Sequence, residues 1–293
     1  MGAAIQLLMS LPSAVIVLGT WTAGGTLGTA RYRNGGAGTT SAALTMGGTT
    51  TASGSSRIAT CELYDGSTWS ATGSLSTARY WGSSCGTSTA ALYISGTTSA
   101  RQGTVEAFDG STWSGGGAIS IGVNSGSSNG TTTAAMQIGG ITTTERVTVQ
   151  SYDGSTWTAG TSLGTGSSTH VSVGTTTATL KFGGSQNGAS TLTESYNGSS
   201  WTTKNAMGYA TQFLGGSGST SSALAFAGQG SVGASNRTQS FDGTSWSVRG
   251  NMLSSRSESA GYGCTNSSTS AFCLGGFLTP ANTTTALTET YAE

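Results

Sequence analysis

The stretch that decides the fold is Tyr64-Asp65-Gly66-Ser67-Thr68-Trp69. Four later stretches repeat its pattern of an aromatic residue, an Asp-Gly or Asn-Gly pair, and a Trp three residues after the Gly, at 108–113, 152–157, 196–201 and 241–246. Asp-Gly and Asn-Gly supply the positive φ angles of a tight turn, and aromatic residues suit a half-buried strand. The motif therefore predicts a β-hairpin that recurs along the chain.

These motif residues are predicted to build turns and strands rather than to bind a ligand. All four Asp residues of the chain fall at the same turn position, where an Asp side chain bonds to nearby backbone groups. The structural assignment covers Asp65, Gly66, Trp69, Asp109, Gly110, Trp113, Asp153, Gly154, Trp157, Trp201, Asp242, Gly243 and Trp246. It leaves few carboxylates for catalysis.

Two further markers recur between the motif Trp residues. An apolar run that ends in Gly-Gly or a remnant of it occurs six times, at 42–48, 90–96, 134–140, 178–184, 222–228 and 270–276. A Glu or Gln precedes each turn aromatic by two residues, at Glu62, Glu106, Gln150, Glu194, Gln239 and Glu289, where we expect it to bond to backbone N–H groups of neighbouring loops. The Trp spacing of 44 to 48 residues, with short strands and Gly-rich turns, is typical of a β-propeller blade.

The order of these markers resembles the kelch repeat, in which a double Gly ends the second strand and a Tyr and a Trp follow at fixed distances. The resemblance covers residues 21–293, and it departs from the kelch pattern in its short Asp-Gly-Ser-Thr-Trp turn and its many Ser and Thr residues. This variety is similar to kelch-like propellers of marine phage and environmental virus proteins. With six copies of the Gly-Gly run and six of the Glu or Gln, we expect an all-β, six-bladed kelch-like propeller with four antiparallel strands per blade.

The two ends of the chain are predicted to complete one blade together. The sixth repeat reaches Tyr291-Ala292-Glu293, where an Asp-Gly-Trp turn and an outer strand would be due. Near the other end, Trp21-Thr22-Ala23-Gly24 matches the segment after each turn, such as Trp157-Thr158-Ala159-Gly160. We therefore expect the strand of Trp21 to pair with the last blade and close the ring, which removes exposed sheet edges.

We divide the chain into an apolar extension at residues 1–19, which begins the closing strand, and a propeller at residues 20–293. The extension lacks a basic n-region and is interrupted by Pro12, and whether residues 1–13 are a processed signal stays open. A membrane span needs roughly 20 uninterrupted apolar residues and is not expected. We expect the extension to dock onto a neighbouring subunit.

Composition narrows the partners and the setting. The chain has 11 basic and 11 acidic residues, and charged residues make up 8% of it, against roughly 25% in an ordinary domain. Without a basic face, nucleic acid is not an expected partner. A surface of hydroxyl groups rather than charges fits a virion or extracellular location.

No metal and no cofactor are predicted. The four Cys residues, Cys61, Cys85, Cys264 and Cys273, form no CxxC pair, and no His-rich cluster accompanies them. Cys264 and Cys273 flank one predicted turn, so a disulfide and free buried thiols are both open alternatives.

No catalytic residue is assigned. The single His, His170, is expected in an inner strand, and no G-x-S-x-G elbow accompanies it, so a Ser-His-Asp triad is not expected. The acids outside the repeat pattern are Glu145, Glu258 and Glu293, which we expect to be solvated loop residues.

Four residues are candidates for contact with a partner or a glycan: Arg31, Arg79, Trp81 and Arg256. The three Arg residues are expected at the start of inner strands, near the mouth of the central channel. There they either hold an anion or a partner's carboxylate, or bond to backbone carbonyls of adjacent blades. Trp81 is the one Trp outside the motif, and if exposed it offers a stacking surface for a sugar or a partner protein.

These features favour a non-enzymatic structural or interaction protein. The most specific expectation is a virion component, such as a tail fibre, tail tip or capsid decoration, that mediates assembly or host attachment. Its partners would be other virion proteins, through the N-terminal segment, and a host surface protein or glycan. The alternatives are a glycan-binding, lectin-like propeller and a kelch-fold enzyme, although one His is too few for a copper centre of the kind known in kelch-fold oxidases.

Overall fold

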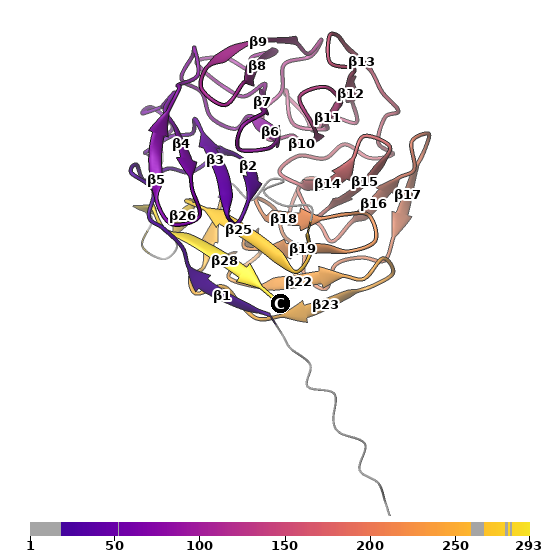
Figure 1. The fold of residues 1–293 in the computed structure, drawn as a ribbon. Coiled ribbons are helices and arrows are strands. Elements are labelled where there is room, and N and C mark those ends of the chain that lie inside the picture. Colours follow the sequence, from indigo (N-terminus) through magenta and orange to yellow (C-terminus); the bar gives the residue numbers. More distant parts are fainter. Residues whose placement is uncertain (1–18, 52, 259–266, 279–280, 282) are drawn as a thin grey trace, which may run out of the picture.

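The computed structural model describes residues 19–51, 53–258, 267–278, 281 and 283–293, and these residues form an all-β structure. Their 28 strands form eight antiparallel sheets, each with a linear strand order, so that none of these sheets closes on itself. The described chain is a propeller-like array of repeated sheets (Figure 1). The extension predicted at residues 1–19 falls, apart from Gly19, outside the described residues.

Five of these sheets contain four strands that follow one another from the centre of the molecule to its rim (Figure 1), and we call them repeats I to V. Repeat I contains β2 (Gly35–Thr39), β3 (Ala42–Met46), β4 (Cys61–Tyr64) and β5 (Trp69–Thr72). Repeat II contains β6 (Ser83–Gly86), β7 (Ala91–Ile94), β8 (Thr104–Phe108) and β9 (Trp113–Ala118). Repeat III contains β10 (Ser127–Gly130), β11 (Ala135–Ile138), β12 (Val149–Tyr152) and β13 (Trp157–Ala159). Repeat IV contains β14 (Val171–Thr175), β15 (Ala178–Phe182), β16 (Thr193–Tyr196) and β17 (Trp201–Lys204). Repeat V contains β18 (Gly215–Gly218), β19 (Ala223–Phe226), β22 (Thr238–Phe241) and β23 (Trp246–Arg249).

Repeat VI joins the two ends of the described chain in one sheet. It contains β25 (Ser270–Leu274), β28 (Thr288–Ala292) and β1 (Thr20–Ala23), in the order β1-β28-β25. Trp21 of β1 lies opposite Tyr291 of β28, so the predicted pairing of the N-terminal strand with the last repeat is confirmed.

Two small sheets lie in the connections between these strands. The hairpin of β20 (Gln229–Gly230) and β21 (Gly233–Ala234) extends the connection between β19 and β22 of repeat V. The other small sheet contains β24 (Arg256–Ser257), β26 (Phe277–Leu278) and β27 (Thr283–Thr284).

The innermost strands lie against one another around the centre. Strands β2, β6, β10, β14 and β18 contact one another in this order, and β25 contacts both β18 and β2. Small residues make this approach possible, because a Cβ atom on Gly35 would lie 2.8 Å from both Met46 Cγ and Tyr93 Cε2. The backbone N–H of Gly36 donates to Ser84 Oγ of the next repeat at 2.9 Å.

A ring of six backbone hydrogen bonds surrounds the centre, with one residue from each repeat. The N–H of each residue donates to the carbonyl of the previous one: Trp81 to Arg33, Ser125 to Trp81, Thr169 to Ser125, Phe213 to Thr169, Glu258 to Phe213 and Arg33 to Glu258, at 2.6 to 3.1 Å. We call these six the axial residues. All six have φ between 54° and 58°, a conformation that costs a non-Gly residue about 1–2 kcal/mol. Each axial residue is held in this conformation by its hydrogen bonds to the previous and the next axial residue of the ring.

Apolar side chains fill the space between consecutive repeats. Leu44 and Met46 of repeat I cluster with Ala91, Tyr93 and Phe108 of repeat II. The turn Trp residues add hydrogen bonds across the same boundaries. The indole N–H groups of Trp69, Trp113, Trp157 and Trp201 donate to the carbonyls of Gly25, Gly73, Gly116 and Thr161 of the preceding repeats.

Trp21→Ala should destabilise the protein by about 3–5 kcal/mol, the usual cost of removing a buried Trp side chain. Trp21 is buried, packs on Phe226 at 5.0 Å between ring centroids, and donates to Thr238 Oγ1 at 2.9 Å, so it attaches repeat VI to repeat V. Urea denaturation measures the change in unfolding free energy. Thr22→Ala is the control, because Thr22 is exposed on the same strand and should change stability by no more than about 0.5 kcal/mol. Equal costs for both variants would contradict the role of Trp21.

Candidate functional site

The Asp residues of the repeated turn bond to their own backbone. Asp65 Oδ1 accepts hydrogen bonds from the N–H groups of Ser67 and Thr68, both at 2.8 Å, and Gly66 has a φ of 99°. The same two bonds recur at Asp109, Asp153 and Asp242. In all four turns the backbone N–H three residues further on is the largest cause that lowers the pKa of the Asp carboxyl. Each carboxylate is therefore an acceptor within its own turn, as its repetition predicts.

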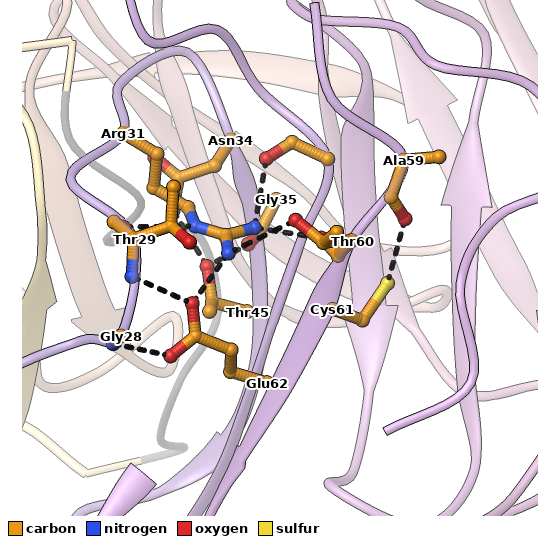
Figure 2. A network of polar contacts seen from close by, with 11 residues as sticks. Gly28, Thr29, Arg31, Asn34, Gly35, Thr45, Ala59, Thr60, Cys61 and Glu62 are labelled. Atoms are coloured by element: carbon orange, nitrogen blue, oxygen red, sulfur yellow. Dashed lines mark hydrogen bonds and ion pairs between the residues drawn. The ribbon is translucent and has the colours of Figure 1, made fainter. Parts of the chain in front are cut away.

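Arg31 and Glu62 form a buried ion pair where the chain enters repeat I (Figure 2). Arg31 donates from Nη1 to the carbonyls of Gly47 and Thr60, at 3.1 and 2.7 Å, and from Nη2 to Glu62 Oε1 at 2.5 Å. Glu62 also accepts from the N–H groups of Gly28 and Thr29, at 2.6 and 3.2 Å. Burial lowers the pKa of Arg31, and the charge of Glu62 opposes that shift.

Every Glu at this position is matched by a cation from its own repeat. Arg79 pairs with Glu106 at 2.8 Å, and Arg256 pairs with Glu289. Repeat IV has Ser167 at the Arg position, and Lys181 of β15 supplies the cation instead, 3.0 Å from Glu194. In repeats III and V the acid is replaced by Gln150 and Gln239, whose Oε1 atoms accept from the N–H groups of Ser120 and Gly208.

The three candidate Arg contacts are therefore wrong as surface contacts. Arg31, Arg79 and Arg256 are 0%, 1% and 0% exposed, so none of them reaches a partner or a glycan. The alternative of bonds to backbone carbonyls is right, but those carbonyls belong to the repeat that each Arg leads into, rather than to an adjacent one. The expectation that the Glu or Gln bonds to loop N–H groups is right at five of the six positions, whereas Glu194 accepts from Lys181 Nζ.

The axial residues carry side chains that differ in every repeat. Arg33 Nε lies 2.5 Å from Glu258 Oε2, and its guanidinium lies 4.1 Å from the ring centroid of Trp81. Trp81 is half-buried there. The axial side chains surround a hollow of about 20 Å³. That volume holds about one water molecule, so small-molecule chemistry does not fit in this hollow.

His170 is buried just before β14, next to the axial residue Thr169. Burial lowers the pKa of His170 well below its usual range, and the charge of Lys181 lowers it further. Within the described part of the chain, no side chain forms a hydrogen bond with either ring nitrogen. A triad His needs bonds to both a nucleophile and an acid, and this environment supplies neither.

The acids outside the repeat pattern all make polar contacts within the protein. Glu258 pairs with Arg33, and Glu293 pairs with Arg249 at 3.2 Å. Glu145 accepts from the N–H of Asn187 at 3.1 Å and from Ser168 Oγ at 3.3 Å. The expectation of solvated loop acids is therefore wrong for Glu258, whose side chain is 13% exposed, whereas Glu145 is half-buried and Glu293 is exposed, as expected.

The thiols lie in the core. Cys61 and Cys85 are free, and burial raises the pKa of the two thiols to about 11 and about 12. Cys273 is buried on β25, whereas Cys264, its suggested partner, lies outside the described residues. Among the described residues there is no group of three or more His, Cys, Asp or Glu side chains that could hold a metal ion, and no helix that is long and apolar enough to cross a membrane.

Sequence reasoning missed two polar residues of this interior. Lys181 lies in an apolar run whose pattern predicts a buried strand. The signal for a buried cation there was Glu194, because repeat IV has no Arg at the position that pairs with Glu in repeats I, II and VI. Arg33 lies two residues after Arg31 and shares its polar character, yet Arg31 is buried and Arg33 lines the axis. The sequence carries no marker for that difference.

No protein-family model and no curated protein sequence matches this chain. Among solved structures, the chain is similar to one described as the structure of YjhT, with a TM-score of 0.74 and 11% sequence identity. The similarity covers 89% of this chain and 95% of that one. At this identity the likeness shows the fold alone.

Arg31→Thr should cost about 3–5 kcal/mol in unfolding free energy, because it leaves the Glu62 carboxylate buried without its cation. Adding Glu62→Gln reproduces the pair found in repeat V, Thr211 with Gln239, and should recover part of the loss. Chemical denaturation of both single variants and the double variant gives the coupling between the two sites. Purely additive losses would contradict the ion-pair interpretation.

His170→Asn should remove a pH dependence of stability. Because the folded-state pKa of His170 is lowered, only the unfolded state binds its proton just below the ordinary pKa of about 6.5. Unfolding free energy therefore falls as pH decreases through this range, by at most about 1.4 kcal/mol per pH unit. The replacement is the residue that repeat I has at the equivalent position, Asn34. Denaturation between pH 5 and 7 measures the slope, and an unchanged slope in the variant would contradict this assignment.

Proposed function

We propose that the chain is a six-bladed propeller of the kelch type, with repeats I to VI as its blades. The ring of six axial hydrogen bonds supports this count, since it contains one residue from each repeat and returns to its starting residue. The first strands of repeats I to V contact one another in the same order, from β2 to β18, and β25, the second strand of repeat VI, contacts both β18 and β2. The second strands end at the Gly-Gly marker, as at Met46 before Gly47 and Gly48, which is the kelch order.

The function that this geometry supports best is that of a non-enzymatic structural or interaction protein. The observation that carries the proposal is that the titratable side chains bond to other groups of the protein itself. The Asp carboxylates accept bonds from their own turns, and the buried Glu carboxylates pair with Arg or Lys inside the repeats. Catalysis requires such groups to be positioned against a substrate, whereas these are fixed by the protein itself.

The setting we propose is a virion, with the protein as a tail fibre, tail tip or capsid decoration. The turns that precede the second strands support an exposed, salt-tolerant surface. Each has three consecutive Ser or Thr residues, at 39–41, 87–89, 131–133, 175–177, 219–221 and 267–269, and its first and third hydroxyls bond to each other. Hydroxyl groups carry no charge that salt would screen.

Glycan binding is the second candidate function, supported by a pocket of about 360 Å³ at these hydroxyl turns. Asn129 and Ser172 line it, and within the described residues Asn129 Oδ1 and Ser172 Oγ are buried without a hydrogen-bond partner. Its lining has no charged side chain, so it suits a neutral, hydroxyl-rich ligand. A glycan array probed with multimers of the protein tests this candidate, and the absence of any signal would count against it.

Purified virus particles test the virion proposal. The full-length chain should co-sediment with particles in a fixed copy number. A chain lacking residues 1–13 should keep its melting temperature, because β1 begins at Thr20, but should be lost from particles. Normal incorporation of the shortened chain would overturn the docking role of the N-terminal segment. Absence of the full-length chain from particles would overturn the virion assignment.

A further inference from the structure

Each repeat has an equivalent interior slot between its entry segment and its second and third strands. Three positions line the slot. The first lies two residues before the axial residue, as Arg31 lies before Arg33. The second and third are partners in the strand pairing, such as Thr45 with Glu62 in repeat I and Ala225 with Gln239 in repeat V. The slot is therefore comparable in all six repeats, whatever the function of the protein.

In five repeats a long side chain of the protein fills this slot. Arg31, Arg79 and Arg256 fill it in repeats I, II and VI, and Lys181 fills it in repeat IV. Repeat III uses Val123 together with Gln137. Repeat V has Thr211 and Ala225, which are short at both of the positions that could supply a filler.

Repeat V consequently contains a pocket of about 220 Å³ at the slot. Thr211, Ala225 and Gln239 line it, together with the apolar side chains of Met207 and Leu214. Thr211 is only 8% exposed, and its Oγ1 has no hydrogen-bond partner in the described part of the chain. A buried hydroxyl without a partner is costly, so the wall of this pocket carries an unpaired polar group.

Repeat III, like repeat V, has a Gln where the other repeats have the buried Glu, and it shows which polar group suits such a slot. There Gln137 Nε2 donates to the carbonyl of Gly139 at 3.0 Å, and Gln150 Nε2 lies 3.5 Å from Gln137 Oε1. The carbonyl of Ala227 is the equivalent acceptor in repeat V, because Ala227 and Gly139 both donate their N–H to the residue before the third strand. Gln239 Oε1 accepts from the N–H of Gly208, as Gln150 Oε1 accepts from the N–H of Ser120.

Charge selects against a cation as the filler of this slot. In the four repeats where a cation fills the slot, a Glu faces it, whereas repeat V has the neutral Gln239. The guanidinium of Arg237, stacked 4.1 Å from the Tyr209 ring centroid at the pocket wall, adds a positive charge that disfavours a second cation. Val232, 92% exposed on the hairpin beside the pocket, offers apolar contact.

We propose that the pocket of repeat V binds a primary carboxamide on a short aliphatic stem, in the place that Gln137 fills in repeat III. The carboxamide N–H donates to the Ala227 carbonyl, and its oxygen accepts from Gln239 Nε2. The group comes either from a Gln side chain of a protein partner or from a small amide. This inference rests on the comparison of the repeats and is independent of the virion assignment.

NMR titration of the full chain tests the proposal with propionamide as the probe. The amide resonances of Ala227 and Arg237 and the side-chain amide of Gln239 should shift and saturate. Propionate and methylguanidinium, of similar size but charged, should bind at least about tenfold more weakly. Equal shifts with propionate would mean an anion site at Arg237 and would overturn the inference, as would no saturable shift with propionamide.

Variants that fill the pocket with a side chain, or that change its charge, test the proposal more sharply. Ala225→Gln places the chain's own carboxamide in the slot and should weaken propionamide binding at least about tenfold. Thr211→Arg with Gln239→Glu fills the slot with the pair of repeat I, and serves if the first variant does not fold. Gln239→Glu alone should reverse the preference towards methylguanidinium. Ser221→Gln is the matched control, since Ser221 is exposed on a turn of the same repeat and does not line the pocket. Undiminished binding by both filled variants would overturn the inference.

Two peptides separate the sources of the amide. Acetyl-Gly-Gln-Gly and acetyl-Gly-Glu-Gly, both with free carboxyl ends, differ only in the group that would enter the pocket. Saturation by the Gln peptide alone supports a protein partner. Saturation by propionamide and by neither peptide keeps the carboxamide pocket and assigns it to a small amide.

Discussion

The ring of axial hydrogen bonds is the constraint on which the rest of the structure depends. Each bond places one residue of a repeat against the next, and each axial residue is held at a positive φ that its side chain disfavours. In repeats I to V the innermost strand begins two residues after the axial residue, so the ring also sets how closely these strands approach and why Gly and Ser are needed in them.

The buried ion pairs show how one architecture tolerates different chemistry in each repeat. The residue two positions before the turn aromatic is Glu in the repeats where an Arg or a Lys of the same repeat pairs with it, and Gln in the repeats where no such cation is present. Moving a charge into the interior costs several kcal/mol unless it is paired, so the two positions are physically coupled even when they come from different strands. The repeats thus share hydrogen-bonding positions rather than residues.

Much of this fold could be predicted from the sequence, because it depends on local signals. The turn at Asp65-Gly66 depends only on residues next to it in the sequence. The pairing of Trp21 with Tyr291 could be predicted because the last repeat stops before its outer strand and a segment that matches such a strand lies near the N-terminus. The interior could not be predicted in the same way. Arg31 looks like a surface residue until the positions of Glu62, Gly47 and Thr60 are known, and the pocket of repeat V arises from two short residues, Thr211 and Ala225, on separate segments. Such features depend on which strands lie side by side, which residue spacing alone does not determine.

The pairing of β1 with β28 has a mechanical consequence. Thr20 lies opposite Ala292, so both described ends of the chain leave the molecule at the same end of one strand pair. A pull that separates these two ends loads the hydrogen bonds of the pair one after another, as in opening a zipper. A load shared around the rim instead acts on many sheets together. The protein should therefore resist a high force when the force is applied through its faces, and should unfold at a lower force when it is pulled by its two described ends.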